Sequence, residues 1–414
     1  MNKNRKIRHI LPKVGMTALM AATAFAGMGT PVFAAAGTNY GTTIEGPKTT
    51  TFDKFLVMDS QANVPNATFS YAVTAGNAKA YSVADKKFQV LAGVDADKIT
   101  MAGVGTNTAN TIAYTPADTT ANDENTMVKN YDKTTEKYAL KTATLNFSKV
   151  QFTEPGVYRY IITESGTNQA ITNDADLTRV LDVYVNDAST ETEKKLTIAG
   201  YVLHSNENDE PDVAAGENAG STGTYVATKS QGFTNEYDTS DLTFKKEVAG
   251  NQASHDKYFK FTVKITDAVK GTVYTVDVTG ADDQSKTNAA TIAENAGKEN
   301  VKTMTVGADG TISQDFYLQH GQEIKIQGIA KDTKYDVTEE KEDYKSEAKA
   351  VTGYTDDVSG KIVSTDLKTS YKNTRDGVIP TGVIMTVAPF AAVTLLGAAG
   401  MVTIKMRKKE DDEE

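Results

Sequence analysis

The 414-residue sequence contains no cysteine, no tryptophan and only four histidines. Without cysteine, no disulfide can cross-link the chain, and adhesion through a cysteine thioester is excluded. His9 lies in the N-terminal segment, and His204, His255 and His320 are far apart in sequence without metal-ligand spacing. We therefore expect these histidines to be structural or solvated, and we expect no metal and no cofactor. The net charge of −10 argues against nucleic acid as a partner.

Familiar catalytic motifs are also missing. The chain has no G-x-S-x-G, no H-E-x-x-H and no paired carboxylates outside the positions discussed below. A nucleophilic hydrolase and a zinc peptidase are thereby disfavoured. We expect that the protein is not an enzyme.

The N-terminus has the parts of a secretory signal peptide. Residues 1–13 are basic, the mostly small and apolar run Val14–Gly27 follows, and small residues follow Pro31. This order predicts a signal peptide over residues 1–36, and the pattern permits cleavage after Ala34 or after Ala36.

The C-terminus combines three features in a fixed order over residues 377–414. The first is the pentapeptide Val378-Ile379-Pro380-Thr381-Gly382, the second is the uncharged stretch Val383–Ile404, and the third is a basic tail. The stretch is long enough to span a bilayer, and the tail would hold that end in the cytoplasm. Together these features resemble a sortase sorting signal of the pilin type, x-V-P-T-G, with isoleucine in place of valine. The resemblance implies that a sortase cysteine attacks the carbonyl of Thr381 and releases Gly382 onward, so that membrane anchoring is transient. A permanently anchored membrane protein is the alternative.

Short alternating runs of Thr, Val, Ala and Tyr, broken by Gly, Asn and Asp, fill the middle of the chain. This texture predicts an all-β fold of sandwich type, without long helices. Gly105–Lys133 and Ser205–Gly223 are polar, and we expect them to be loops or insertions.

Three short motifs occur twice in the same order. The first copies are Thr51-Phe52-Asp53-Lys54, Tyr160-Ile161-Ile162-Thr163-Glu164 and Phe233-Thr234-Asn235, and the second are Thr243-Phe244-Lys245-Lys246, Tyr335-Asp336-Val337-Thr338-Glu339 and Tyr371-Lys372-Asn373. The repeat predicts two homologous domains, 37–238 with polar insertions and 239–376, between the signal peptide and the sorting signal.

One lysine, one glutamate and one asparagine in each repeat lie on the apolar face of their strand. Side chains alternate along a strand, so residues two apart share a face. By this parity the buried polar residues are Lys54, Glu164 and Asn235 in the first repeat and Lys246, Glu339 and Asn373 in the second.

Burial favours the neutral forms of lysine and glutamate. A neutral lysine is a nucleophile, and a nearby glutamic acid could polarise an asparagine amide and shuttle protons. The pattern therefore favours an autocatalytic Lys–Asn isopeptide bond in each domain. Two buried, hydrogen-bonded salt bridges are the alternative interpretation.

A family resemblance supports the first interpretation. The segment Phe152-Thr153-Glu154-Pro155-Gly156-Val157-Tyr158-Arg159-Tyr160, leading to Thr163-Glu164, is similar to the F-x-x-P-G-V-Y-x-Y…T-E segment of T-antigen-type streptococcal backbone pilins. Asp343-Tyr344-Lys345-Ser346-Glu347 resembles their second domain, which here lacks a P-G-V-Y run. The resemblance implies two tandem Ig-like sandwiches of the collagen-adhesin B type. It also implies an isopeptide bond in each, Lys54–Asn235 with Glu164 and Lys246–Asn373 with Glu339.

The resemblance also implies an assembly. A pilin sortase would join Thr381 to a lysine of the next copy, for which Lys229 is the nearest match although its spacing and flanking residues depart from the family pattern. The implied partners are the sortase, copies of the same chain, peptidoglycan or a basal pilin, minor pilins and host surface ligands. The implied location is a pilus on the cell wall. The alternative is a wall-anchored adhesin or basal pilin that does not polymerise.

Overall fold

The computed structural model describes residue 40, residues 44–83, 86–128 and 130–205, residues 209 and 211, and residues 229–280 and 300–378. The predicted signal peptide lies outside these residues. So does the predicted sorting signal beyond Val378, an exposed residue at the end of the described chain. Among the described residues, no helix is long and apolar enough to cross a membrane.

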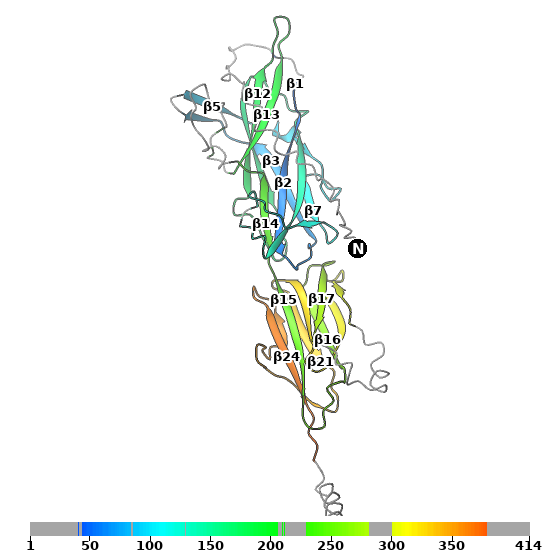
Figure 1. The fold of residues 1–414 in the computed structure, drawn as a ribbon. Coiled ribbons are helices and arrows are strands. Elements are labelled where there is room, and N and C mark those ends of the chain that lie inside the picture. The colour runs from blue at the N-terminus through cyan, green and yellow to red at the C-terminus, as the bar shows by residue number, and fades with distance from the viewer. Residues whose placement is uncertain are drawn as a thin grey trace, which may run out of the picture.

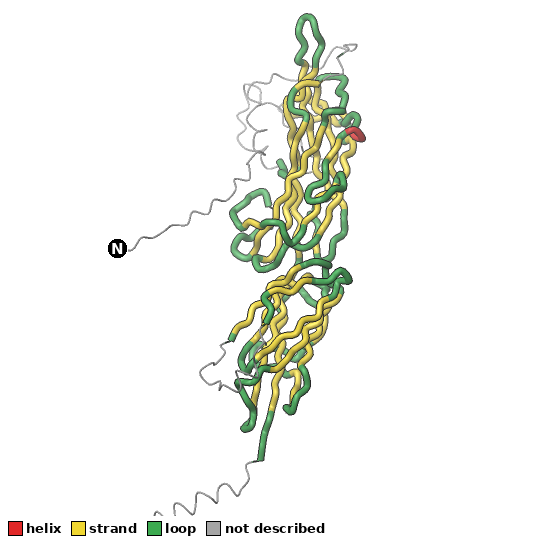
Figure 2. Tube along the Cα trace, turned by 90° about the vertical axis from the view of Figure 1, so that its right-hand side faces the viewer, coloured by secondary structure: helices red, strands yellow, loops and turns green. Residues whose placement is uncertain are grey.

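Strands form the regular structure of the described chain, apart from the single-turn 3-10 helix η1 (Ala96–Lys98). Figure 1 shows them as two bodies placed end to end, with β14 leading into β15 where the bodies meet. Figure 2 shows the same arrangement from the side, with loops gathered at the ends of each body. The predicted fold class, all-β with two tandem Ig-like sandwiches, is confirmed.

The N-terminal sandwich consists of two sheets. The first sheet has the order β1-β13-β12-β10-β3-β7, with β5 pairing with β10 and β4 with β5. The bounds of its strands are β1 (Ile44–Glu45), β3 (Ala67–Ala75), β4 (Lys79–Val83), β5 (Lys86–Ala92), β7 (Thr111–Tyr114), β10 (Gly156–Ser165), β12 (Thr178–Asp187) and β13 (Leu196–His204).

The facing sheet has the order β11-β14-β2-β9-β6, with β8 attached to β9. The bounds of its strands are β2 (Thr49–Asp59), β6 (Thr100–Met101), β8 (Thr120–Ala121), β9 (Glu136–Asn146), β11 (Ile171–Thr172) and β14 (Gly232–Tyr237). The first long strand, β2, and the last strand, β14, are therefore neighbours, and they run parallel.

The C-terminal sandwich repeats this closure of first strand against last. One sheet has the order β18-β17-β20-β15-β24-β22, in which β15 and β24 are parallel neighbours, and the other has the order β19-β16-β21-β23. The bounds are β15 (Thr239–Ala249), β16 (Phe259–Thr266), β17 (Val273–Thr279), β18 (Thr303–Thr305), β19 (Ile312–Leu318), β20 (Glu323–Ala330), β21 (Lys334–Glu339), β22 (Lys345–Ala348), β23 (Ser359–Lys361) and β24 (Leu367–Thr374).

One of the two polar stretches expected to be a loop contributes to the core. Within Gly105–Lys133, strand β7 buries Ile112 and Tyr114 in the main core, and Val128 packs with Tyr138 over the outer face of β2. Because this stretch covers its outer face, β2 is buried on both faces. The expectation that Gly105–Lys133 lies outside the core is wrong, because its few apolar side chains point inward while most of its polar residues stay at the surface.

The two sandwiches are in contact at their junction. The Asn63 side chain donates to the carbonyl of Val273 at 2.8 Å, and Lys331 donates its backbone N–H to Asp238 at 3.0 Å. Gly328 has a φ of +67°, and a Cβ added there would lie 2.6 Å from the Cα of Ala62. A larger residue at position 328 would therefore push the two bodies apart.

Candidate functional site

The first predicted site is assembled from three strands. Lys54 lies on β2 and Asn235 on the adjacent parallel strand β14, while Glu164 comes from β10 in the facing sheet. In the register of the parallel pair, Phe233 is opposite Lys54, so Asn235 is two residues further along on the same face. All three side chains are buried, as the period-two pattern predicted.

Glu164 is the centre of this site. Lys54 Nζ lies 2.7 Å from Glu164 Oε2 and donates to Oε1 at 2.9 Å, and Asn235 Nδ2 donates to Oε1 at 2.8 Å. Tyr71 adds a third donor, because its hydroxyl donates to Oε2 at 2.6 Å. The carboxyl group thus contacts both the amine and the amide nitrogen.

The electrostatics of the site favour a reactive lysine. Burial lowers the pKa of Lys54 to about 8, although the carboxylate of Glu164 acts in the opposite direction. The ammonium group also lies 4.3 Å from the ring centroid of Phe69, so aromatic surface replaces part of its water shell. A substantial fraction of the Lys54 amines is therefore neutral near pH 8.

The second predicted site repeats the first in different strands. Lys246 lies on β15, Asn373 on the parallel strand β24, and Glu339 on β21 of the facing sheet. Tyr371 is opposite Lys246, so the asparagine is again two residues beyond the lysine's partner.

The contacts at the second site match those at the first. Lys246 Nζ lies 2.5 Å from Glu339 Oε1, and Asn373 Nδ2 donates to the same oxygen at 2.9 Å. Burial lowers the pKa of Lys246 to about 8, against the effect of Glu339. Its Nζ lies 4.3 Å from the ring centroid of Phe259. The structure therefore brings all six sequence-predicted residues together as two separate triads.

Two hydroxyl donors to the glutamates were missed by sequence reasoning. Tyr71 donates to Glu164, and Ser346 donates to Glu339 Oε2 in the equivalent role. Tyr71 lies on β3 of the sheet that carries Glu164, whereas Ser346 lies on β22 beside Asn373. Because the two hydroxyls come from different residue types and different positions, no repeated motif could reveal them.

A buried ion pair beside Asn235 was also missed. Arg179 Nη2 lies 2.5 Å from Asp174 Oδ2, and Arg179 Nε donates to the carbonyl of Gly232 at 2.8 Å. Asp174 Oδ2 in turn accepts the backbone N–H of Thr234 at 2.9 Å. These contacts hold β14 at the site. A Cβ on Gly232 would fall 1.7 Å from the carbonyl oxygen of Asp53, so only glycine permits β14 to approach β2 so closely.

Lys229, the predicted linkage lysine, lies apart from both triads. It is partly buried and forms an isolated antiparallel bridge with His204 at the end of β13. The next residue, Ser230, donates its backbone N–H to Leu203 at 2.9 Å. Its predicted partner Thr381, and with it Ile379, Pro380 and Gly382, lies outside the described residues.

The histidines occupy two different environments. His204 is fully buried, with Nε2 3.3 Å from Asp182 Oδ2, and Asp182 also binds Arg159. His255 and His320, distant in sequence, stack with ring centroids 4.2 Å apart. Within the part of the chain that the structure describes, no group of three or more His, Cys, Asp or Glu residues could hold a metal ion.

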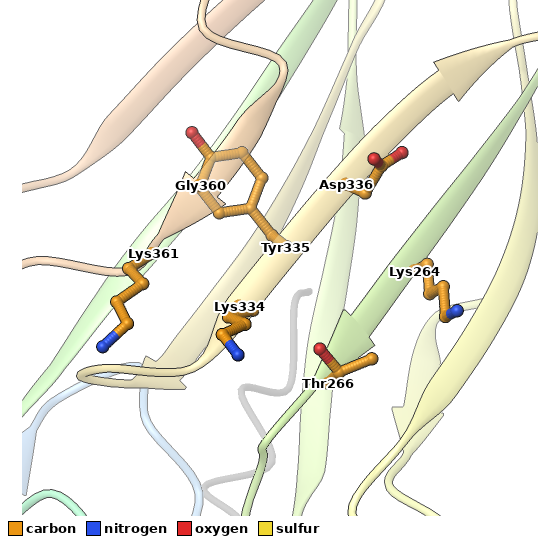
Figure 3. A pocket seen from close by; sticks show the side chains of 7 residues that line it. All are labelled: Lys264, Thr266, Lys334, Tyr335, Asp336, Gly360 and Lys361. Atoms are coloured by element: carbon orange, nitrogen blue, oxygen red, sulfur yellow. The ribbon is translucent and has the colours of Figure 1, made fainter.

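A surface pocket of about 470 Å³ lies over β16, β21 and β23. Figure 3 shows its lining, with the side chains of Lys334 and Lys361 on one side and that of Lys264 near Asp336 on the other. None of the six triad residues lines it. The triads are buried inside the two sandwiches and lie apart from this pocket.

Comparison with known proteins gives a family match for the second sandwich and a similar protein for nearly the whole chain. Residues 240–375 match a family described as a domain of unknown function (DUF7601). The chain is 24% identical over 396 residues to a protein named pilin from Streptococcus pyogenes serotype M1, which covers 91% of this chain and 95% of that protein.

Solved structures of pilins are also similar to this chain. The major pilin T3.2 from Streptococcus pyogenes serotype GAS13637 is 21% identical with a TM-score of 0.46, and another Streptococcus pyogenes major pilin is 20% identical with a TM-score of 0.47. Each match covers 80% of this chain and 100% of the pilin. The similarity in sequence over nearly the whole chain confirms the resemblance to streptococcal pilins that the motifs indicated.

Proposed function

We propose that this protein is a structural subunit of a covalent surface pilus, and that each sandwich is cross-linked by an autocatalytic Lys–Asn isopeptide bond. One observation carries the proposal. In both sandwiches a buried lysine and a buried asparagine lie on adjacent parallel strands with the same two-residue offset, and a glutamate faces them from the other sheet. Coincidence is a poor explanation for two such triads, because burying each charged pair is costly. The similarity to a pilin over nearly the whole chain supports the same function.

The proposed reaction is a transamidation. The neutral amine of Lys54 attacks Cγ of Asn235, a C–N bond forms, and the bond from Cγ to Nδ2 breaks. Glu164 accepts a proton from the attacking nitrogen and delivers it to Nδ2, which leaves as ammonia. Lys246, Glu339 and Asn373 react in the same way. No oxidant, metal or cofactor takes part.

The bonds would give the fold mechanical strength. Each joins the first long strand of a sandwich to its last strand and closes a loop of more than a hundred residues. Cross-links of this kind constrain the unfolded chain, and on the entropic model each stabilises the fold by about 5 kcal/mol. Such a bond replaces the disulfides that a chain without cysteine cannot form.

The finer assembly is part of the proposal. The chain is secreted through its signal peptide, and a pilin sortase cleaves between Thr381 and Gly382 and joins Thr381 to Lys229 of another copy. The finished polymer is attached to peptidoglycan or a basal pilin, with minor pilins as further partners. Residues 37–238 and 239–376 are two units, each stabilised by one bond. The protein is a sortase substrate rather than an enzyme.

The intact mass of the chain without its two terminal signals tests the isopeptide chemistry. Wild-type protein should be lighter than its sequence by two ammonia molecules. The variants Glu164→Ala and Glu339→Ala should each be lighter by one, and the double variant by none. A wild-type mass equal to the sequence mass, on folded protein, would refute the internal bonds.

Polymerisation is tested separately in the native host. Wall extracts boiled in detergent should contain a ladder of high-mass species, and Lys229→Arg should abolish it. Lys195→Arg is the matched control, because Lys195 lies on the same sandwich in a surface ion pair with Glu45. If no ladder exists in the wild type, a non-polymerising wall adhesin replaces the shaft subunit. If Lys229→Arg leaves the ladder intact, a different lysine is the acceptor.

A further inference from the structure

The two triads differ in how the asparagine carbonyl oxygen is held. Asn235 Oδ1 accepts the backbone N–H of Asp174 at 2.9 Å. Asn373 Oδ1 is buried as well, but within the described residues it has no hydrogen-bond partner. In most proteins a buried polar atom finds a partner, so this contrast between equivalent atoms calls for a chemical explanation.

The difference arises from the strand that flanks each asparagine's strand on the side away from the lysine. This strand is β11 beside β14 in the first sandwich and β22 beside β24 in the second. In the first sandwich β11 ends at Thr172, opposite Glu236, and the chain then turns so that the N–H of Asp174 reaches the Asn235 side chain. In the second sandwich β22 continues past this position as a regular strand, with Ser346 paired to Asn373. The Ser346 hydroxyl donates to Glu339 Oε2 instead of to the amide oxygen.

We propose that the backbone N–H of Asp174 is an oxyanion donor for the first isopeptide bond, that Arg179 positions it, and that the first bond consequently forms before the second. The proposal rests on the transamidation proposed above. Attack of Lys54 on Cγ makes a tetrahedral centre whose negative charge develops on Asn235 Oδ1. A donor already aimed at that oxygen stabilises the transition state, and removal of one such donor typically slows an enzyme by about 10²–10³-fold.

The same N–H also fixes the orientation of the amide. A backbone N–H can only donate, so the atom facing Asp174 must be the oxygen of Asn235. The nitrogen Nδ2 must then face Glu164, and it also donates to Asn173 Oδ1 at 3.1 Å. The leaving nitrogen is thereby held next to the carboxyl group that delivers its proton. No described residue donates a hydrogen bond that would fix the oxygen of Asn373 in this way.

Arg179 holds the donor in place. Its guanidinium pairs with Asp174 Oδ2 and donates to the backbone of Gly232, so it joins the turn carrying the N–H to the strand carrying the asparagine. The side chain is fully buried and lies 4.6 Å from the ring centroid of Phe233. None of its contacts among the described residues is to a reacting atom, so it acts through the position of the donor, while its charge adds to the effect of burial in lowering the pKa of Lys54.

The experiment follows both bonds in the full mature chain. A short pulse of cell-free synthesis is quenched in acid at intervals, and mass spectrometry of the digest measures the Lys54–Asn235 and Lys246–Asn373 cross-linked peptides. We expect the first cross-link to form about 10²-fold faster than the second. Equal rates, or a faster second bond, would overturn the proposal. If neither peptide forms, the isopeptide chemistry itself fails, which is a distinct result.

A pair of arginine variants separates positioning from general stability. Arg179→Met should slow the first bond toward the rate of the second without changing the second, and Arg179→Lys should restore part of the rate. Arg159→Met is the matched control, because Arg159 is also buried and ion-paired in the same sandwich but binds Asp182. Unchanged first-bond kinetics in folded Arg179→Met, or equal slowing in Arg159→Met, would overturn the role of Arg179. Should Arg179→Met not fold, the rate ratio of the two bonds in the wild type still decides the order.

Discussion

At the scale of single residues, Lys54 and Lys246 are the nucleophiles of the proposed chemistry. Each amine lies over an aromatic ring and against a carboxyl group, and burial lowers the pKa of each to about 8. Period-two parity was enough to predict that both side chains point inward. It could not predict that the nearest acceptor would be a glutamate of the facing sheet, because that depends on how the sheets stack.

The lowered pKa values predict a pH dependence of bond formation. Only the neutral amine attacks, so the initial rate at each site should rise about tenfold per pH unit well below pH 8 and level off above it. Pulse-synthesised chain, transferred to buffers of different pH, gives these rates by mass spectrometry. Lys54→Arg should abolish the first bond and leave the pH profile of the second unchanged. A rate independent of pH below 8 would contradict a lysine nucleophile.

Removal of the Tyr71 hydroxyl should weaken the first triad. In a chain carrying Asn235→Ala, which cannot form the first bond, Tyr71→Phe should lower the free energy of unfolding by about 1.5–3 kcal/mol, because a donor to a charged group is lost. Chemical denaturation of the single and double variants measures this difference. Tyr274→Phe, at a buried tyrosine of the other sandwich whose hydroxyl has no hydrogen-bond partner among the described residues, is the control for loss of a hydroxyl. No change on Tyr71→Phe would mean that its contact with Glu164 adds no stability.

At the scale of elements, a buried polar network connects three neighbouring strands on the outer face of the first sheet. Arg159 on β10 makes a two-pronged pair with Asp182 on β12, at 2.8 Å for each contact, and His204 on β13 approaches the same carboxylate. Three neighbouring strands are thus connected through one carboxylate. The sequence does not indicate that these residues meet, because the pairing order of strands is a long-range property.

Loss of the Asp182 charge from this network should lower the free energy of unfolding by an amount that depends on pH. Burial alone would raise the pKa of Asp182, but the hydrogen-bonded guanidinium of Arg159, together with the neighbouring His204, keeps it below its usual value. Its stabilising contribution is therefore present above the unfolded-state pKa and is lost as the pH falls through the lower folded-state pKa. Asp182→Asn should lower the free energy of unfolding by about 3–5 kcal/mol at neutral pH, because Arg159 loses its counter-charge.

Denaturation as a function of pH measures both effects. The difference between Asp182→Asn and the wild type should shrink in strong acid. Glu193→Gln, in an exposed pair with Lys195, is the control and should change the free energy by no more than about 1 kcal/mol. A difference between Asp182→Asn and the wild type that stays constant down to strong acid would show that the Asp182 charge is not the stabilising feature.

At the scale of the whole molecule, the two sandwiches form a rod whose strands run along its length (Figure 1). β14 passes directly into β15, so the proposed cross-link of the first body ends beside the start of the second. A pull between the ends would then act mainly on the covalent path through the two bonds and the short segment between Asn235 and Lys246. Most of each sandwich would carry little load.

Single-molecule stretching tests this path. The wild-type chain should extend without unfolding either sandwich. Glu339→Ala should release only the residues between Lys246 and Asn373, and Glu164→Ala only those between Lys54 and Asn235, with about 3.5 Å gained per released residue. Unfolding of both sandwiches in the wild type at ordinary forces would contradict the presence of the bonds.

The sequence by itself determined the all-β class and the inward direction of the six triad residues, because side-chain alternation is a local property of a strand. It also indicated the resemblance to pilins through short contiguous motifs. The tertiary structure alone decided which strands are neighbours, and so brought Tyr71, Ser346 and the Asp174–Arg179 pair to the triads. It also gave the side-chain oxygen of Asn235 a backbone N–H donor, because one flanking strand ends where the other continues. The side-chain oxygen of Asn373 has no such donor among the described residues. Contacts between residues far apart in the chain depend on sheet order and register, which no local pattern encodes.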